Sequence, residues 1–228
     1  MQTKLKVTLL AHTPDADKLV AAAAKLCYAK ADVDTLLDNL TAEKVEEFLN
    51  RLADLGHESP IEHASYTFAV EGVSRALLAQ LTRHRIASYS VQSQRYVDKA
   101  DFDYVIPPSI AANMEAKNAY IQCMNLATAC YGLFTMIGIP NEDARFVLPN
   151  ACDTRIIFTM NARSLHNFFR LRCCNRAQWE IRAMADEMLK LCREVSPVLF
   201  RHAGPSCAVS GKCSEGAYCC GEPREEFK

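Results

Sequence analysis

The sequence predicts an α+β protein that is mostly helical and has a small mixed or antiparallel sheet. Two observations support this fold class. Long segments place apolar residues at helical spacing, and they take up most of the chain. Only a few short segments combine β-branched and aromatic residues in the way that strands do. These strand-like segments are residues 4–12, 66–73 and 154–160.

Local signals mark where the helices begin and end. Pro14 opens the first helix, and Thr41 is a suitable N-cap for the second, which ends near Gly56. Asn141 is expected to cap a short helix, and Pro197 to stop the last one. The expected helices cover residues 15–29, 41–56, 74–84, 109–137, 141–149, 161–173 and 177–194.

The composition fits a soluble protein of one domain, or of one domain with elaborations. The chain has 228 residues, half of them hydrophobic, with a formal net charge of −1. A balanced charge provides no overall field for nucleic acid or for an anionic membrane. No apolar run approaches the ~18–20 residues that span a bilayer, and the first residues lack the features of a signal peptide. We therefore expect a cytoplasmic protein with one α+β domain over residues 1–200 and a Cys-rich tail over 201–228.

Eleven cysteines are an odd and large number for a chain of this length. Without a secretion signal, a disulfide framework is not expected. Five of them lie in apolar, helix-like contexts where a reduced thiol behaves as a small hydrophobe, namely Cys27, Cys123, Cys130, Cys152 and Cys192. The tail cysteines Cys207, Cys213, Cys219 and Cys220 lack the usual spacing of zinc ligands, even with His202 as a further donor. A mobile, reduced tail is favoured over a metal site.

The stretch RHRIASYSVQSQRY, residues 83–96, gathers four cationic side chains and several hydroxyl and amide groups. It contains no carboxylate, whereas a loop that serves solubility usually mixes both signs of charge. Arginine forks suit phosphate and carboxylate oxygens, and the serines and glutamines can complete the hydrogen bonds. The alternative is a solvated basic loop, but the apolar segment ALLAQL directly before it ties the motif to the core.

Two further segments have the character of binding sites. In NARSLHNFFRLRCCNRAQWE, residues 161–180, Asn161 and Arg172 are three helical turns apart, so we expect them to share a helix face roughly 16 Å long. An amphipathic helix with ordinary surface arginines explains its phenylalanines but not its asparagines. In GHESPIEHA, residues 56–64, the six-residue spacing places His57 and His63 on different sides of a helix and Pro60 interrupts it, so a metal pair is not expected. A polar turn that contacts a ligand, or a helix cap, is the better interpretation.

These segments together resemble the flavin-dependent thymidylate synthases. The family signature is Arg-His-Arg, seven residues and Ser, which here is Arg83-His84-Arg85, IASYSVQ and Ser93. NARSL…N…LR…AQWE, GHESPIEH and ARFVLP also resemble this family, in the same order, over most of residues 5–200. Ser90-Val91 departs from the Asn-Glu of some relatives.

The resemblance implies an FAD-dependent methyltransferase that converts dUMP to dTMP, with methylenetetrahydrofolate as carbon donor and NADPH as reductant. It implies a homotetramer whose active sites are shared between subunits, and no protein cysteine nucleophile. By position, the cofactor-binding residues would be His57, Ser59, Glu62, Arg83, His84, Arg85 and Ile86, together with Asn161, Arg163, Asn167 and Arg176 from other subunits. The substrate-binding residues would be Gln80, Ser93, Gln94, Arg95, Arg145 and Arg172, with Arg172 and Ser93 catalytic.

Two other functions compete with this one. A nucleic-acid-binding module could use the basic loop and helix, but the neutral total charge and the single tryptophan argue against it. A flavoprotein with the same scaffold could act on a different nucleotide. Flavin absorbance of the purified protein would distinguish a flavoenzyme from a nucleic-acid-binding module. Analysis of the nucleotide product would distinguish dUMP methylation from action on a different nucleotide.

Overall fold

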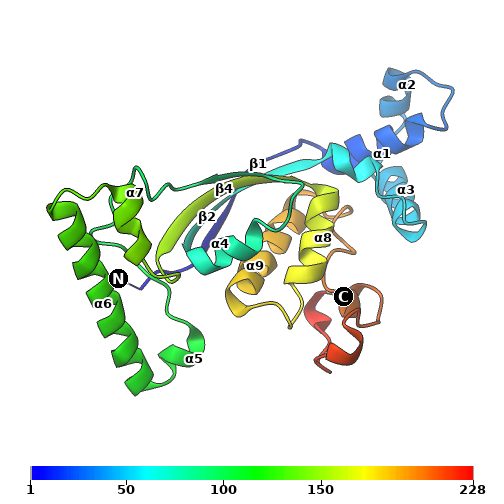
Figure 1. Cartoon of the computed structure of the whole chain (residues 1–228). Helices are drawn as coiled ribbons and strands as arrows, with labels where there is room; N and C mark the ends of the chain where they lie inside the picture. The colour runs from blue at the N-terminus through cyan, green and yellow to red at the C-terminus, as the bar shows by residue number, and fades with distance from the viewer. Residues whose placement is uncertain (1, 228) are drawn as a thin grey trace. The chain divides into compact units, whose positions relative to one another are not determined.

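The computed structural model describes residues 2–227 and contains a four-stranded sheet (Figure 1). The strand order is β1-β2-β4-β3. Backbone N–H of Thr13 bonds to the carbonyl of Ser65, and backbone N–H of Arg75 bonds to the carbonyl of Cys152. These pairs make β2 antiparallel to both of its neighbours. The strands are β1 (Lys6–His12), β2 (Ser65–Ser74), β3 (Ser88–Val91) and β4 (Asp153–Asn161).

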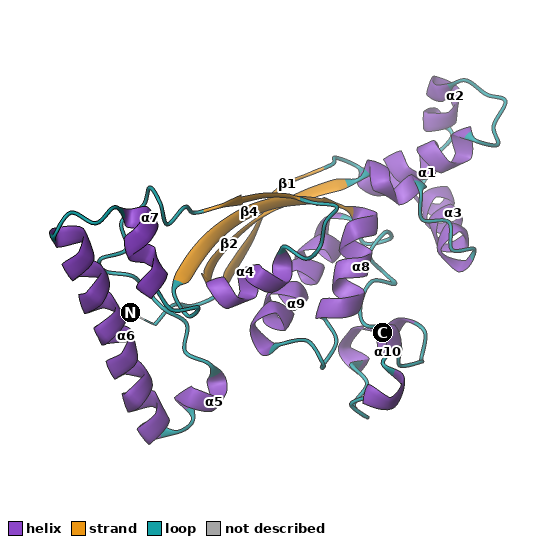
Figure 2. Ribbon diagram, in the orientation of Figure 1, coloured by secondary structure: helices purple, strands orange, loops and turns teal. Residues whose placement is uncertain are grey.

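Helices make up most of the rest of the described chain, as Figure 2 shows. The three longest are α6, α9 and α3, and several others span only one turn. The α-helices are α1 (Ala16–Leu26), α2 (Val33–Asp38), α3 (Ala42–Asp54), α4 (Arg75–Leu81), α5 (Pro108–Ala111), α6 (Met114–Met136), α7 (Asn141–Ala144), α8 (Ala162–Arg172), α9 (Trp179–Val195) and α10 (Ser206–Val209). The 3-10 turns are η1 (Pro60–His63), η2 (Arg145–Val147), η3 (Gly216–Tyr218) and η4 (Glu225–Phe227).

The chain divides into two compact units. The first comprises residues 1–6, 69–83 and 89–157, and the second comprises 7–68, 84–88 and 158–228. Strands β1, β2 and β4 each contribute residues to both units. Each unit is described by itself.

The second unit has an aromatic core. Alternate side chains of β2 and β4 are buried, with Tyr66 and Phe68 on one strand and Phe158 on the other. The Tyr66 ring meets Phe200 edge-on at 5.1 Å between centroids, and its hydroxyl donates to Ser196 Oγ at 2.7 Å. Helices α8 and α9 pack side by side, each with a wholly buried apolar face (Figure 2). The rigid core thus fixes α8, which carries several candidate site residues.

The first unit holds α4 and α6 and a smaller cluster of buried side chains. Phe102, Met124 and Cys152 form this cluster, which Tyr104 and Tyr120 cover in part. Gly72 in β2 has a φ of 69°. A Cβ added there would lie 2.1 Å from the carbonyl oxygen of Lys4, so only glycine allows this close approach of the segment that precedes β1.

Most predicted elements are present, and the differences have local causes. Helix α6 starts at Met114 and not at residue 109, because Pro107 and Pro108 confine the preceding residues to the one-turn helix α5 and Asn113 then caps α6 through Ala116 N. Asn141 is the first residue of α7 and not its cap, a position that Pro140 takes without a side-chain hydrogen bond. Helix α2 and strand β3 were not predicted.

The cysteines are less uniform than their contexts indicate. All eleven lie within residues 2–227 and are free thiols. Cys152 and Cys192 are buried as expected, although Cys152 lies directly before β4 and not in a helix. Cys27 and Cys123 are exposed, which corrects the expectation that they behave as core hydrophobes.

The Cys-rich tail is not a free extension. Arg224 makes two hydrogen bonds to the Asp186 carboxylate, at 3.0 and 3.3 Å, and a third to the carbonyl of Cys173. Arg193 of α9 donates to the carbonyl of Phe227 at 3.1 Å. These contacts dock the tail onto α8 and α9, whereas a mobile tail was expected.

None of the helices in the described residues combines the length and the apolar character that crossing a bilayer requires.

Candidate active site

The Arg-His-Arg motif follows directly from an anchored helix. Ser74 caps α4 by accepting from Leu77 N at 3.1 Å, and Leu77 and Leu81 are completely buried. The chain leaves the helix at Thr82, so the motif begins at a fixed point. Arg83 and Arg85 are exposed, and Ile86 is 74% exposed. An exposed isoleucine directly after these cations suits a surface that contacts a flat, partly apolar ligand.

His84 is the motif residue that turns inward, and it meets α8. Arg172 Nε donates to His84 Nε2 at 3.2 Å, and the imidazole stands edge-on to Phe168 at 4.9 Å between centroids. Burial, together with the nearby Arg172 charge, lowers the pKa of His84 to about 4. The imidazole is therefore neutral near pH 7, with its proton on Nδ1. The Arg-His-Arg motif and α8 are therefore in contact within one chain.

A second junction joins the start of α8 to the turn η1. Arg163 Nη1 contacts Glu62 Oε1 at 2.5 Å, and Arg163 Nε contacts Glu58 Oε2 at 3.2 Å. Backbone N–H of Ala162 also donates to the carbonyl of Ala64 at 2.8 Å. Glu62 and Arg163 were both predicted as site residues, whereas Glu58 was not. The only sequence feature that indicated a binding role for Glu58 is its position within GHESPIEH.

Asn161 begins α8 and does not lie on its face. Its side-chain oxygen accepts from Ser164 N at 2.8 Å, so the asparagine is the N-cap. The expectation that Asn161 and Arg172 share a helix face is corrected in this respect, although both ends of the helix remain available to one ligand. Further along, Asn167 accepts from Arg170 at 3.0 Å and is exposed.

Two arginines of the first unit contact Glu142, one at its carboxylate and the other at its backbone carbonyl. Arg95 contacts Glu142 Oε2 through Nη2 at 2.7 Å and through Nε at 2.9 Å, while Arg145 Nε donates to the Glu142 carbonyl at 3.0 Å. Arg95 and Arg145 were both predicted to bind substrate, and Glu142 was missed. Two guanidinium groups around one residue form a local cationic centre, from which the Glu142 carboxylate can be displaced by a phosphate.

The loop between β3 and Arg95 contains both partly exposed and buried side chains. Ser93 Oγ accepts from Arg95 N at 3.1 Å and so shapes the turn. Gln94 is buried, and its amide donates to Cys152 Sγ at 3.7 Å, which is a structural contact. The side-chain oxygen of Gln92 is buried without a hydrogen-bond partner in the described residues. Sequence reasoning overlooked Gln92, although it lies within the motif.

The remaining candidates lie on the surface of their own units. Gln80 is half-buried on α4, and its carbonyl accepts from Arg83 N at 3.4 Å. His57 and Ser59 are exposed before η1, and Arg176 donates to the carbonyl of Tyr218 at 2.6 Å. No three His, Cys, Asp or Glu side chains within residues 2–227 are arranged to hold a metal ion.

Comparisons with known proteins identify the family of the chain. The family model "Thymidylate synthase complementing protein" matches residues 8–198. Flavin-dependent thymidylate synthases from Clostridium tetani and Geobacter sulfurreducens are each 52% identical, over 98% and 97% of this chain and 96% of their own lengths. A crystal structure of a UMP/dUMP methylase, PolB, from Streptomyces cacaoi bound with 5-Br dUMP has a TM-score of 0.78 at 24% identity. It covers 87% of this chain and 93% of its own, and it shows that the fold is shared. The chain therefore belongs to the flavin-dependent thymidylate synthase family.

Proposed function

We propose that this enzyme reductively methylates dUMP to dTMP, with methylenetetrahydrofolate as the carbon donor and NADPH as the reductant of FAD. The observation that supports it most strongly is the Arg172–His84 hydrogen bond, which joins α8 to the Arg-His-Arg motif. The reaction itself is proposed from family membership. Through this hydrogen bond, two segments that were predicted to bind ligands, the Arg-His-Arg motif and α8, are in contact.

The second unit carries most of the side chains proposed for FAD. Arg85 and Arg176 are exposed cations, and Arg163 is half-exposed in a pair of surface ion pairs. Surface ion pairs of this kind are weak, so a pyrophosphate can replace Glu58 and Glu62 as the partner of Arg163. The donor set therefore fits FAD. We assign it to His57, Ser59, Glu62, Arg83, His84, Arg85, Ile86, Asn161, Arg163, Asn167 and Arg176.

The proposed nucleotide site uses Arg95 and Arg145 for the phosphate of dUMP. Both lie around Glu142, and two arginines match the charge of a monophosphate. Ser93 would orient the nucleotide, and Gln80 would provide a polar contact from α4. Gln94 is buried against Cys152, so it would act through its backbone or by holding the loop.

Arg172 would stabilise negative charge that develops on the uracil ring. A neutral His84 accepts from the guanidinium Nε and so holds the orientation of the guanidinium group. A guanidinium fixed before the reaction stabilises the transition state without reorganising, which is the main source of electrostatic catalysis. Bound FAD would supply the one-carbon transfer and the reducing electrons.

Cysteine chemistry is not needed for this reaction, and the thiols near α8 are unsuited to it. Burial raises the pKa of the Cys173 thiol, and the nearby Asp186 carboxylate raises it further. Burial likewise raises the pKa of Cys152 and of Cys192. A protonated thiol is a poor nucleophile. We therefore propose that no cysteine adds to the pyrimidine.

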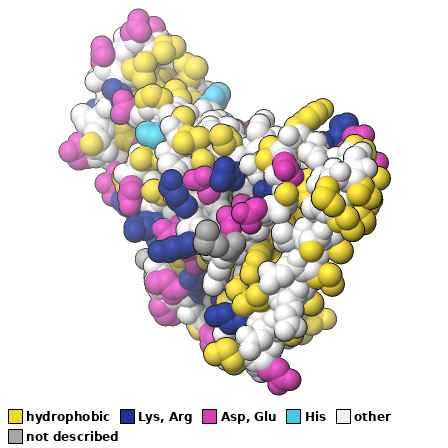
Figure 3. Space-filling model, turned by 90° about the vertical axis from the view of Figure 1, so that its left-hand side faces the viewer, with side chains coloured by type: hydrophobic (Ala, Val, Ile, Leu, Met, Phe, Trp, Pro, Cys, Tyr) yellow, Lys and Arg dark blue, Asp and Glu magenta, His cyan; other side chains and the backbone are white. Residues whose placement is uncertain are grey.

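We also propose that the enzyme is a cytoplasmic homotetramer with shared active sites. Six apolar residues on the exposed side of α6 and its C-terminus follow each other at intervals of four and three residues, the spacing of a helix-packing seam. Leu126 and Leu133 are 66% and 49% exposed, and Figure 3 shows hydrophobic side chains on this side of the molecule. A second copy would cover the seam. Its residues are Ala119, Cys123, Leu126, Cys130, Leu133 and Ile137.

An anaerobic assay tests the proposed function. The purified enzyme is incubated with dUMP, methylenetetrahydrofolate and NADPH, and nucleotides are separated by chromatography. Formation of dTMP that depends on all three compounds supports the proposal. Turnover of a cytidine nucleotide in place of dUMP, or dTMP formation without flavin, would contradict it.

A further inference from the structure

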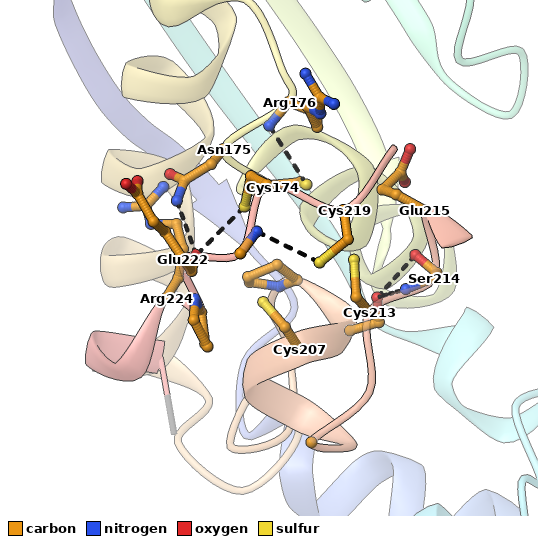
Figure 4. A pocket seen from close by; sticks show the side chains of 16 residues that line it. Cys174, Asn175, Arg176, Cys207, Cys213, Ser214, Glu215, Cys219, Glu222 and Arg224 are labelled. Atoms are coloured by element: carbon orange, nitrogen blue, oxygen red, sulfur yellow. Dashed lines mark hydrogen bonds between the residues drawn. The ribbon is translucent and has the colours of Figure 1, made fainter. Parts of the chain in front are cut away.

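The tail and the loop after α8 enclose a cavity lined by five cysteines. Its volume is about 230 Å³, and its walls include Arg176 and Glu215 beside the thiols (Figure 4). Two of these cysteines, Cys213 and Cys219, stand at the two ends of the segment that contains η3. The five cysteines are Cys174, Cys207, Cys213, Cys219 and Cys220. The reaction proposed above uses none of them.

The walls of this cavity are held in place from outside. Arg224 bonds to Asp186 and to the Cys173 carbonyl, and Asn175 donates to the Glu222 carbonyl at 3.1 Å. On the other side, Ser206 Oγ donates to Ser214 Oγ at 2.8 Å and accepts from Ser214 N at 3.2 Å. The segment from Cys213 to Cys219 is therefore fixed at both of its ends.

Cys213 and Cys219 line the same cavity. Figure 4 shows the two side chains beside one another, and each thiol shifts the pKa of the other. Cys219 Sγ accepts from backbone N–H of Gly221 at 3.4 Å. Both residues are exposed, so a reagent in solution can reach them.

The two thiols differ in reactivity. The Gly221 N–H bond, the Cys213 thiol and the Arg176 charge together lower the pKa of Cys219. Cys213 has a favourable backbone bond from Glu215, but the Cys219 side chain leaves its pKa raised. A thiolate beside a protonated thiol is the arrangement of an attacking cysteine with a resolving partner.

We propose that Cys213 and Cys219 form a reversible thiol–disulfide exchange site for low-molecular-weight disulfides. The Cys219 thiolate attacks one sulfur of the reagent RSSR, forms a mixed disulfide and releases RS⁻, which takes up a proton. Cys213 then loses its proton and attacks Cys219 Sγ, which expels the second RS⁻. The protein loses two hydrogen atoms, and RSSR is reduced to two RSH.

The other cysteines of the cavity have different partners. Cys220 Sγ donates to the Glu222 carbonyl at 3.4 Å, and Cys174 Sγ accepts from backbone N–H of Arg176 at 3.5 Å. Both sulfurs hydrogen-bond to the backbone, which sets Cys174 and Cys220 apart from the pair of Cys213 and Cys219.

Mass spectrometry tests the pairing in the full chain. The protein is equilibrated with graded mixtures of reduced and oxidised glutathione, quenched in acid, alkylated and digested with trypsin. Cleavage after Lys212 and Arg224 leaves Cys213, Cys219 and Cys220 in one peptide, whereas Cys207 and Cys174 fall in others. In the oxidised protein we expect this peptide to carry one disulfide, which removes two hydrogen atoms, and one alkyl group, on Cys220. In the reduced protein all three of its cysteines should be alkylated. A second expected result is that Cys219 in the reduced protein reacts with iodoacetamide roughly fivefold or more faster than Cys213.

Two matched variants complete the test. Cys219→Ser should lose the internal disulfide entirely, and Cys220→Ser should keep it at the same glutathione ratio as the parent protein. The proposal is overturned if both Cys213 and Cys219 remain fully alkylated at every ratio. It is also overturned if the oxidised peptide pairs Cys220, or is cross-linked to the peptide that carries Cys207 or Cys174. These outcomes are read from the unmutated protein, so they do not depend on how a variant folds.

Discussion

Nε of the Arg172 guanidinium donates a hydrogen bond to Nε2 of His84 across 3.2 Å, and the edge of the same imidazole rests on Phe168. Eighty-eight residues separate the two partners along the chain. The bond requires a neutral imidazole, because a protonated one has no acceptor nitrogen. The protonation state of His84 therefore controls how the central arginine of the proposed site is held.

This bond predicts a pH dependence of stability. The pKa of His84 is near 4 in the folded protein and near its usual 6.5 in the unfolded chain, so the unfolded chain binds more protons between these values. As the pH falls from about 6.5 towards 4, this residue makes folding less favourable. The variant His84→Asn keeps an acceptor for Arg172 but cannot titrate. In urea unfolding at equal flavin content, the parent should lose more stability than the variant between pH 8 and pH 5. Equal losses would show that His84 does not titrate in this way.

Removing the Arg172 guanidinium should affect chemistry far more than folding. A charge-assisted hydrogen bond made more strongly in the transition state contributes about 2–4 kcal/mol. Arg172→Ala should therefore lower kcat/KM for dTMP formation by roughly 30- to 1000-fold or more, since dUMP binding weakens as well. It should keep FAD and still oxidise NADPH slowly. The control is Arg51→Ala, on the exposed last turn of α3, which should change neither quantity. Near-normal dTMP synthesis by Arg172→Ala would make this arginine a surface residue.

The exposed cations should govern flavin content. Arg83→Ala and Arg163→Ala each remove a proposed phosphate partner, so both proteins should purify folded but poor in FAD, as judged by the ratio of flavin to protein absorbance. Because the Arg163 ion pairs are at the surface, its loss should leave the unfolding temperature of the flavin-free protein almost unchanged. Full flavin occupancy in both variants would refute the assignment.

The thiols next to α8 should be dispensable for turnover. Cys173 is buried with a raised pKa, and Cys174 accepts a backbone hydrogen bond. Cys174→Ala should retain most dTMP formation, and so should Cys173→Ala, apart from any loss of folded protein through the small cavity it leaves. A folded, flavin-loaded variant with no turnover would restore a cysteine mechanism.

The sequence predicted the elements that build the site better than it predicted their exact limits. In β2 and β4 every second side chain is buried, and the sequence shows this as an alternation of residue types. The apolar face of α8 is likewise visible in the sequence as a helical spacing of apolar residues. Strand β3 was missed because its residues, SYSV, form part of the polar motif, and only pairing within the sheet reveals it. Asn161 was taken as a helix-face residue because spacing alone does not distinguish a cap from the first turn.

Most of the contacts within the site could not be predicted from the sequence. Position and residue type indicated Arg95, Arg145 and Arg172, but not that Glu142 lies between the first two or that His84 accepts from the third. Each of these contacts joins segments that are distant in the chain or depends on a turn geometry. The docking of the tail through Arg224 is of the same kind, since a single arginine among polar residues carries no signal of its partner.

A single-turnover experiment tests the central claim most directly. The enzyme-bound flavin is reduced chemically under anaerobic conditions, excess reductant is removed, and dUMP and methylenetetrahydrofolate are added without NADPH. If the flavin supplies the electrons and no cysteine is needed, dTMP should form in an amount roughly equal to the flavin reoxidised, in the parent and in Cys174→Ala alike. Flavin that stays reduced while dTMP forms, or flavin that is reoxidised with no dTMP, would contradict the proposed reaction.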